Sequence, residues 1–219
     1  MSQNRSHAVM AQRHEPDDSL DFFPTPAWAT RALCRHVLQM VETGNLDAMT
    51  AWEPACGIGS MAEPLREYFG QTHASDVHDY SADYPGQDRV CDFLWPDSAS
   101  PALRANPADW VITNPPFRLG QQFIERALSL NPRGVAMLVR TAFLESADRF
   151  ALYRRNPPAV VAQFVERVPM VKGRLDRKAS TATSYCWIVW RRGEADTRFR
   201  WIPPCRKQLD RDTDWPVSA

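Results

Sequence analysis

Short apolar runs alternate along this chain with longer amphipathic stretches, and this alternation narrows the possible folds more than any other feature. The apolar runs that we expect to form strands are residues 49–54, 71–76, 90–93, 110–113, 135–140, 160–168 and 184–190. The stretches that we expect to form helices are residues 27–41, 61–69, 121–130 and 147–154. Strands that alternate with helices are typical of βαβ units, which build parallel sheets with helices on both faces. The pattern predicts one α/β domain around a mostly parallel, seven-stranded sheet.

The length of 219 residues is enough for one sizeable hydrophobic core. We expect residues 1–20 to be a flexible N-terminal segment, residues 21–205 to form the domain, and residues 206–219 to be a C-terminal tail. No apolar run approaches the roughly 20 residues that cross a membrane, and the N-terminus lacks the apolar stretch of a signal peptide. These features predict a soluble, cytoplasmic protein without a membrane partner.

The charge is distributed unevenly, although the formal net charge is zero. The chain up to Phe117 carries 7 Lys and Arg against 16 Asp and Glu, and the remainder carries 19 against 10. A basic half can contact phosphates while an acidic half binds a cationic ligand. The alternative, that folding mixes the two halves into an ordinary solvated surface, stays open on the sequence.

Cysteine and histidine are placed in a way that indicates neither a disulfide framework nor a metal site. The residues in question are Cys34, Cys56, Cys91, Cys186 and Cys205, and His7, His14, His36, His73 and His78. Their spacings are long and irregular, and no CxxC pair occurs. The sequence also lacks a phosphate-binding P-loop, an HExxH zinc motif and a GxSxG nucleophile motif, so we expect none of those chemistries.

A glycine-rich turn, Glu53-Pro54-Ala55-Cys56-Gly57-Ile58-Gly59, lies where a strand is expected to end and a helix to begin. Glycines let the backbone approach a ligand closely, because no Cβ stands in the way. The third glycine of the dinucleotide motif GxGxxG is absent. The acid at Glu53 suits a ligand with a positive charge or hydroxyl groups, and it is a poor neighbour for a pyrophosphate. The alternative reading is a tight strand–helix turn without a ligand.

Two further acids follow the next expected strands. Asp76 ends one strand, where its carboxylate can take both hydroxyls of a ribose, since ligands of open α/β sheets bind beyond the carboxyl ends of the strands. Asp92 and Phe93 end the next, where they can hydrogen-bond the amino group of a purine and stack on its ring. Together with the glycine turn, these residues predict an adenosine site.

The most specific motif is Asn114-Pro115-Pro116-Phe117, directly after the apolar strand at residues 110–113. The two prolines stiffen the backbone and donate no hydrogen bonds, so the Pro115 carbonyl becomes a fixed acceptor beside the Asn114 side-chain oxygen. Two acceptors that hold both N–H groups of a planar amine draw its lone pair out of conjugation with the ring. Phe117 offers a face on which a planar base can stack. The motif predicts methyl transfer to an amino nitrogen.

With these motifs the chain resembles S-adenosylmethionine-dependent amino-methyltransferases of the DNA N6-adenine type, in a small form similar to those of phages and prophages. The glycine turn resembles their cofactor motif, and Asn114 to Phe117 resemble their catalytic tetrapeptide. Phe23-Pro24-Thr25-Pro26 is similar to the segment that covers the methionine end of their cofactor; from the residues alone, Thr25 and Pro26 also suit the start of a helix.

The resemblance implies a Rossmann-like class I methyltransferase fold, whose last strand runs antiparallel, and S-adenosylmethionine as the cofactor. It implies a catalytic group of Asn114, Pro115, Pro116 and Phe117. The cofactor-binding residues that it implies are Phe23, Thr25, Glu53, Pro54, Ala55, Gly57, Gly59, Asp76, Asp92, Phe93 and Asn114. The substrate implied is adenine in DNA, flipped from the duplex or taken from a single strand, and the reaction requires no metal and no covalent enzyme intermediate.

Several alternatives to DNA methylation remain at this stage. Asn in the first position of the tetrapeptide is shared with enzymes that methylate RNA or the glutamine amide of release factors, so those nitrogens are alternative targets. A non-catalytic nucleic-acid-binding domain with the same fold is another. Methylation of cytosine carbon 5 is excluded, because Phe117 stands where a nucleophilic cysteine would be needed.

A basic loop is expected at residues 169–183, between the last two predicted strands. Its cations are Lys172, Arg174, Arg177 and Lys178, which we expect to contact a nucleic-acid backbone. The alternative is an ordinary solvated surface loop. The segment at residues 140–145 is expected to line the pocket for the target base.

Overall fold

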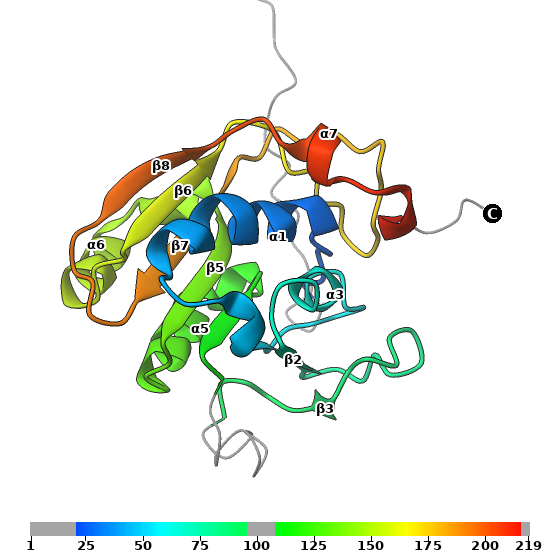
Figure 1. Cartoon of the computed structure of the whole chain (residues 1–219), viewed down its shortest axis with the longest axis horizontal. Coiled ribbons are helices and arrows are strands. Elements are labelled where there is room, and N and C mark those ends of the chain that lie inside the picture. Colours follow the sequence, from blue (N-terminus) through cyan, green and yellow to red (C-terminus); the bar gives the residue numbers. More distant parts are fainter. Residues whose placement is uncertain (1–20, 96–107, 216–219) are drawn as a thin grey trace, which may run out of the picture.

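The computed structural model describes residues 21–95 and 108–215, which form one sheet covered by helices on both faces (Figure 1). The strand order is β3-β2-β1-β4-β5-β7-β6-β8. The strands are β1 Thr50–Glu53, β2 Gln71–Asp76, β3 Arg89–Val90, β4 Trp110–Thr113, β5 Gly134–Arg140, β6 Val160–Phe164, β7 Tyr185–Arg191 and β8 Arg198–Ile202. Only β7 runs antiparallel to its neighbours, β5 and β6. The predicted mostly parallel α/β sheet is confirmed, with eight strands instead of seven.

The additional strand, β8, lies at the edge of the sheet and pairs in parallel with β6. Its sequence, Arg-Phe-Arg-Trp-Ile, gives no apolar run, because basic and aromatic residues alternate. Phe199 and Trp201 remain exposed, whereas Ile202 is buried. A strand that buries a single side chain cannot be recognised from hydrophobicity, so the sequence analysis missed it.

The helices form two layers. One face of the sheet carries α1 (Ala27–Leu33), a π-helical segment (Cys34–Leu38), α2 (Gln39–Val41), α3 (Ala62–Leu65) and α7 (Arg206–Leu209). The other face carries α5 (Gly120–Ser129) and α6 (Ala147–Arg155). Short 3₁₀ turns cover Leu46–Ala48, Phe117–Leu119, Thr141–Leu144 and Asp212–Asp214. This arrangement confirms that helices flank both faces.

The central strands are buried on both faces, which explains their continuous apolar sequences. In β4, Trp110 and Ile112 pack on the side of α1, whereas Val111 packs on the side of α5. In β5, Leu138 and Met137 divide between the two sides in the same way. The centre of the sheet is therefore a rigid support for the residues that follow these strands.

Several predicted boundaries change in the structure. The helix expected at residues 61–69 is helical only over Ala62–Leu65, and hydrogen-bonded turns continue it to Phe69. The strand expected at residues 90–93 is limited to Arg89–Val90, and that expected at 160–168 ends at Phe164. The cap that we expected from Thr25 is wrong: its hydroxyl donates to Met170 Sδ at 3.9 Å and makes no capping bond to α1.

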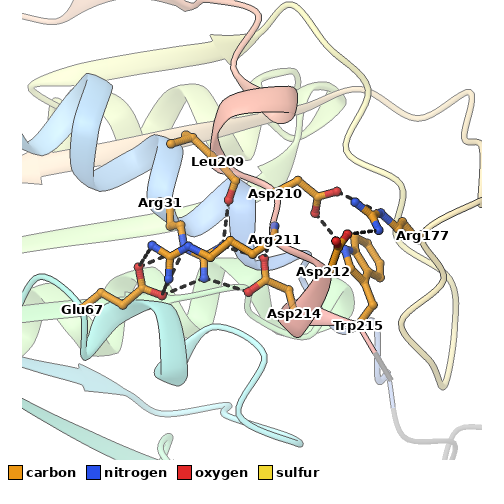
Figure 2. Close-up of polar contacts among 9 residues, drawn as sticks. All are labelled: Arg31, Glu67, Arg177, Leu209, Asp210, Arg211, Asp212, Asp214 and Trp215. Atoms are coloured by element: carbon orange, nitrogen blue, oxygen red, sulfur yellow. Dashed lines mark hydrogen bonds and ion pairs between the residues drawn. The ribbon is translucent and has the colours of Figure 1, made fainter. Parts of the chain in front are cut away.

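The chain beyond residue 205, expected as a tail, packs against the domain as far as Trp215 (Figure 2). Leu209 on α7 is buried in the core, and its carbonyl accepts a hydrogen bond from Arg31. The Arg31 guanidinium also binds Asp214 at 2.6 Å and Glu67 at 2.7 Å. The folded part of the chain therefore extends to Trp215. The segment expected to be flexible at residues 1–20, and residues 216–219, lie outside the described residues.

We expect acid to destabilise the fold through Glu42, which is fully buried after α2 between two arginines. Hydrogen bonds from Arg133 lower the pKa of Glu42 to about 2. Because the folded-state pKa lies below that of the unfolded chain, this stabilisation is present above about pH 4.5 and is lost as the pH falls toward 2. Urea unfolding between pH 7 and pH 3 measures it, and Glu42→Gln should reduce the acid-dependent loss by about 2 kcal/mol.

The matched control for this prediction is Glu194→Gln. Glu194 pairs with Arg198 at 2.7 Å, but both side chains are more than one-third exposed. An exposed pair contributes about 0–1 kcal/mol, so this variant should keep the acid dependence of the unmodified protein. Equal acid dependence in the Glu42→Gln variant and the unmodified protein would contradict the prediction.

Candidate active site

A cleft of about 220 Å³ opens at the carboxyl ends of β1, β2 and β4. It collects most of the residues predicted for the site: Phe23, Thr25, Glu53, Pro54, Ala55, Gly57, Asp76, Asp92, Phe93, Asn114 and Pro116. Gly59, Pro115 and Phe117 do not line it. Since neighbouring parallel strands end at one edge of the sheet, segments far apart in the sequence meet there.

The glycine turn after β1 requires its two glycines. Gly57 has a φ of +49°, and a Cβ at this position would lie 2.6 Å from the Phe22 ring. Gly59 has a φ of +76°, and a Cβ there would lie 2.4 Å from the Tyr84 ring. The absence of a side chain at Gly57 thus leaves room for Phe22 beside the cleft. Gly59 allows the turn to pack against Tyr84 and does not line the cleft.

Glu53 is a buried carboxyl with one unused oxygen. Glu53 is the last residue of β1, and the Thr113 hydroxyl donates a long hydrogen bond of 3.5 Å to its Oε1. No hydrogen-bond partner among the described residues reaches Oε2. Burial, and secondarily the charge of Asp76, raise the pKa of Glu53 well above its usual value. A cationic ligand would stabilise the ionised form of this buried carboxyl and would supply the partner that Oε2 lacks.

Asp76 and Asp92 differ in their surroundings. Asp76 accepts backbone N–H groups from Gly57 at 2.9 Å and from His78 at 3.0 Å, and burial raises its pKa. These bonds hold its carboxylate at the edge of the cleft, beside the glycine turn. Asp92 is exposed and accepts the N–H of Leu94 at 2.9 Å.

Phe93 is mainly a core residue. Its ring packs against Trp52 at a centroid distance of 5.1 Å and against Phe123 at 5.0 Å, and the residue is 2% exposed. Only a small part of it lines the cleft. The stacking of a cofactor ring on Phe93 stays a prediction. Phe93 offers a ligand only the small part of its surface that lines the cleft.

Asn114 follows β4 and is oriented by two contacts. Its Nδ2 donates to the carbonyl oxygen of Phe23 at 3.0 Å and to Met170 Sδ at 3.6 Å. The amide oxygen, Oδ1, takes no part in these contacts. It is buried and has no hydrogen-bond partner among the described residues. A buried acceptor without a partner costs free energy, so it marks a place where a donor is expected to bind.

Phe117 follows Asn114 by three residues, outside the cleft lining, and is half-buried. Its backbone N–H donates to the Asp21 carboxylate, which fixes the start of the 3₁₀ turn. The ring contacts Phe23 at a centroid distance of 4.9 Å. The Arg140 guanidinium carbon lies 3.9 Å from the ring centroid, above its face.

The sequence analysis missed several residues that line or close the site, among them Asp21, Ser60, Tyr80 and Met170. Ser60 Oγ is buried in the cleft wall and has no partner among the described residues, and the Tyr80 ring contacts that of Phe22 at a centroid distance of 5.5 Å. Met170 belongs to the basic loop, 56 residues after Asn114. Ser60 could have been predicted, because it directly follows the glycine turn. Met170 could not, because no motif near it in the sequence indicates a contact with Asn114.

The basic loop contacts the site, and its predicted cations Arg174 and Arg177 form ion pairs with acidic residues. Gly173 donates its N–H to the Phe22 carbonyl at 2.9 Å, which joins the loop to the cleft. Arg174 pairs with Asp176 at 3.2 Å. Arg177 pairs with Asp212 at 2.6 Å and with Asp210 (Figure 2). Lys178 is exposed and Lys172 is half-buried. Phosphate contacts by this loop stay a prediction, and these ion pairs would compete with them.

Nucleophilic catalysis by cysteine is disfavoured at this site. Cys56 is the cysteine that lines the cleft, and burial raises the pKa of its thiol, which keeps it protonated. No group of three side chains suited to hold a metal ion occurs in residues 21–95 and 108–215. In the same ranges, no helix is long and apolar enough to cross a membrane.

Comparison with solved structures identifies the fold. The methyltransferase subunit of a type I restriction-modification system from Streptococcus thermophilus matches with a TM-score of 0.60 and 14% identity, over 90% of this chain and 50% of that one. A candidate class I S-adenosylmethionine-dependent methyltransferase from Listeria monocytogenes matches with a TM-score of 0.56 and 16% identity, over 86% and 67%. This chain has the class I methyltransferase fold.

Methyltransferases described for different substrates share this fold. A candidate RNA methyltransferase from Pyrococcus horikoshii matches with a TM-score of 0.57 and 13% identity, over 81% of this chain and 91% of that one. The chain spans about half the length of the restriction-modification subunit. No protein-family model and no curated protein matches the sequence. The comparisons therefore establish the class I methyltransferase fold, and the choice of substrate depends on the site.

Proposed function

We propose that this protein transfers a methyl group from S-adenosylmethionine to the exocyclic N6 of adenine in DNA. The observation that carries the proposal is Asn114 Oδ1, a buried acceptor at the end of β4 with no partner among the described residues. An amino group supplies the N–H donor that this oxygen lacks. Glu53 Oε2 is another buried oxygen that no described residue reaches; it lies in the wall of the adjoining cleft and suits a cation. The site thus combines a hydrogen-bond acceptor for an amine with a binding site for a positively charged ligand.

The residues of the cleft fit S-adenosylmethionine. Glu53 offers a carboxylate to a cationic group, the glycine turn allows close approach of the ligand, and Asp76 is positioned for hydroxyl groups. When bound, this ligand supplies a methyl group activated by its attachment to a positively charged sulfur. S-adenosylmethionine fits the cleft because it has a positively charged group, which suits Glu53, and a sugar with hydroxyl groups, which suits Asp76.

Asn114 acts on the amine by accepting a hydrogen bond, and the Phe23 carbonyl holds its amide in the required orientation. A neutral amide does not take up a proton, so Asn114 positions the nitrogen without serving as a general base. After methyl transfer, the proton of the alkylated nitrogen leaves to water. Holding the amine and the methyl donor in line provides most of the rate acceleration.

DNA is the favoured substrate because the tetrapeptide resembles that of N6-adenine enzymes and a restriction-modification subunit shares the fold. Adenine in RNA and a protein amide are alternatives with the same nitrogen chemistry. Incubation with cofactor labelled in its methyl group and separate pools of DNA, RNA and protein tests the choice. We expect label in DNA, as N6-methyladenine; label confined to RNA or protein would replace DNA by that substrate.

We expect cofactor binding to release a proton. Burial raises the pKa of Glu53 and so favours its protonated form, whereas a cation beside Oε2 favours the ionised form. Affinity should therefore rise with pH until the pH exceeds the pKa of the free cleft, and then level off. Calorimetry in buffers of different ionisation enthalpy measures the released proton.

The variant that tests this role is Glu53→Gln, which should weaken S-adenosylmethionine binding by at least about tenfold and abolish the proton release. Glu125→Gln is the control, because Glu125 is exposed on α5 and pairs with Arg155 away from the cleft. A titration of the unmodified protein that shows no binding would favour a non-catalytic nucleic-acid-binding domain instead.

A further inference from the structure

Arg140 occupies the face of Phe117 on which a substrate base would stack. It is the last residue of β5, paired in register with Tyr185 on β7, and its guanidinium carbon lies 3.9 Å from the centre of the Phe117 ring. A separation of 3.9 Å is van der Waals contact, so no base fits between Phe117 and the guanidinium. The space present admits one planar group, and Arg140 fills it.

The contacts that hold Arg140 in this place are weak. Its side chain is exposed, and none of the ion pairs found among the described residues includes it. Burial raises the pKa of the Tyr185 hydroxyl, and the charge of Arg140 and its side-chain hydrogen bond with Tyr185 oppose this rise. A stacking base can replace an exposed cation over an aromatic face, because both interactions are of similar strength.

Asn114 independently indicates that this side of the site is closed in the free protein. Its Oδ1 has no partner within residues 21–95 and 108–215 and is buried, although an amino group must contact it for the proposed reaction. Some covering group therefore moves when a substrate binds. Phe23 also covers the Phe117 ring, but its carbonyl orients Asn114, so its displacement would disturb the acceptor itself.

We propose that Arg140 takes the place of the target base above Phe117 in the free protein and that the base displaces it on binding. This inference rests on the proposed function and names a residue that controls access of the substrate. Arg140 is a positioning residue in this scheme: it competes for the stacking face and takes no part in methyl transfer. Only a base free of its own stacking partners, in a single strand or flipped from a duplex, can replace it.

The chain contains a matched control in Arg149, whose guanidinium carbon lies 4.0 Å from the centre of the Phe143 ring. This contact has a similar distance, but Phe143 lies outside the Asn-Pro-Pro-Phe tetrapeptide, and Arg149 also hydrogen-bonds the Gln121 side chain. Ring currents shift the N–H signal of an arginine above an aromatic face. Spectra of the ¹⁵N-labelled full chain report both contacts at once, with signals assigned through Arg140→Lys and Arg149→Lys.

The titrant is a short single-stranded oligodeoxynucleotide with one adenine, added with S-adenosylhomocysteine. We expect the Arg140 Nε–H signal to move to the position of an unstacked arginine at saturation, while the Arg149 signal stays in place. An oligothymidine of equal length should move neither signal. An Arg140 signal that keeps its ring-current shift in the saturated adenine complex would overturn the inference.

A second measurement separates competition for the ring from contacts with phosphate. The probe is 2-aminopurine deoxyriboside, a fluorescent adenine analogue without a phosphate. Arg140→Met should bind it about two- to thirtyfold more tightly than the unmodified protein, whereas Arg149→Met should not differ. In steady-state methylation, Arg140→Met should lower KM for deoxyadenosine and leave kcat nearly unchanged. An unchanged or weaker affinity would overturn the inference.

Methylation of the same adenine oligonucleotide by the unmodified protein distinguishes the two levels of the argument. If the oligonucleotide is methylated while Arg140 keeps its place, this inference fails and the proposed function stands. If neither this oligonucleotide nor double-stranded DNA is methylated, the proposed function fails, and the inference fails with it.

Discussion

Asn114→Ala should lower kcat for methyl transfer by about 10²- to 10³-fold while S-adenosylmethionine binds with nearly unchanged affinity. The substitution removes Oδ1, the buried oxygen to which no residue in the described part of the chain donates a hydrogen bond. It leaves Glu53, the glycine turn and Asp76 in place, and these residues form most of the cleft for the cofactor. Single-turnover methylation gives the loss in rate, and calorimetry gives the cofactor affinity.

Asn114→Asp is the informative companion to this variant. It retains an acceptor oxygen but loses the amide donor that binds Phe23 O and Met170 Sδ. We expect it to be more active than Asn114→Ala, because an acceptor remains, and less active than the unmodified protein, because its orientation is less constrained. Full activity of the Asn114→Ala variant would refute the proposed function.

Arg31→Leu should destabilise the fold by about 3–5 kcal/mol. Arg31 is 4% exposed and binds Asp214, Glu67 and the carbonyl of Leu209 (Figure 2). Its removal leaves the Asp214 carboxylate, 8% exposed, without its strongest partner. The last folded segment of the chain should then separate from α1 and α3. Urea unfolding measures the loss, which corresponds to a decrease in Tm of about 6–20 °C for a chain of this size.

Arg211→Leu separates this role from a general effect of charge. Arg211 binds the same Glu67 at 2.9 Å, but its side chain is 55% exposed. We expect a cost of about 0–1 kcal/mol, since solvent screens an exposed pair. If the two variants lose equal stability, burial of the Arg31 cluster is not what fastens the C-terminal segment.

The elements found from the sequence are those whose signal is local. The apolar runs of β4 and β5 identify buried strands, and the glycines at positions 57 and 59 identify a turn that no other residue would adopt without strain. The Asn-Pro-Pro-Phe motif is also local, because its stiffness comes from adjacent prolines. In contrast, β8 buries a single side chain, so its pattern carries no such signal.

The sequence by itself determined the class of fold, the positions of the glycine turn and of Asn114, and the chemistry suited to each, because periodicity and backbone restriction act between near neighbours. The tertiary structure alone decided that Met170 orients Asn114, that Arg31 fastens residues near Asp214, and that Arg140 covers Phe117. These contacts join residues that are distant along the chain. Arg140 reaches Phe117 because β4 and β5 are neighbours in the sheet, and Arg31 reaches Asp214 because α1 and α7 pack together on one face. Pairing across the sheet depends on strand order, which a one-dimensional pattern does not contain.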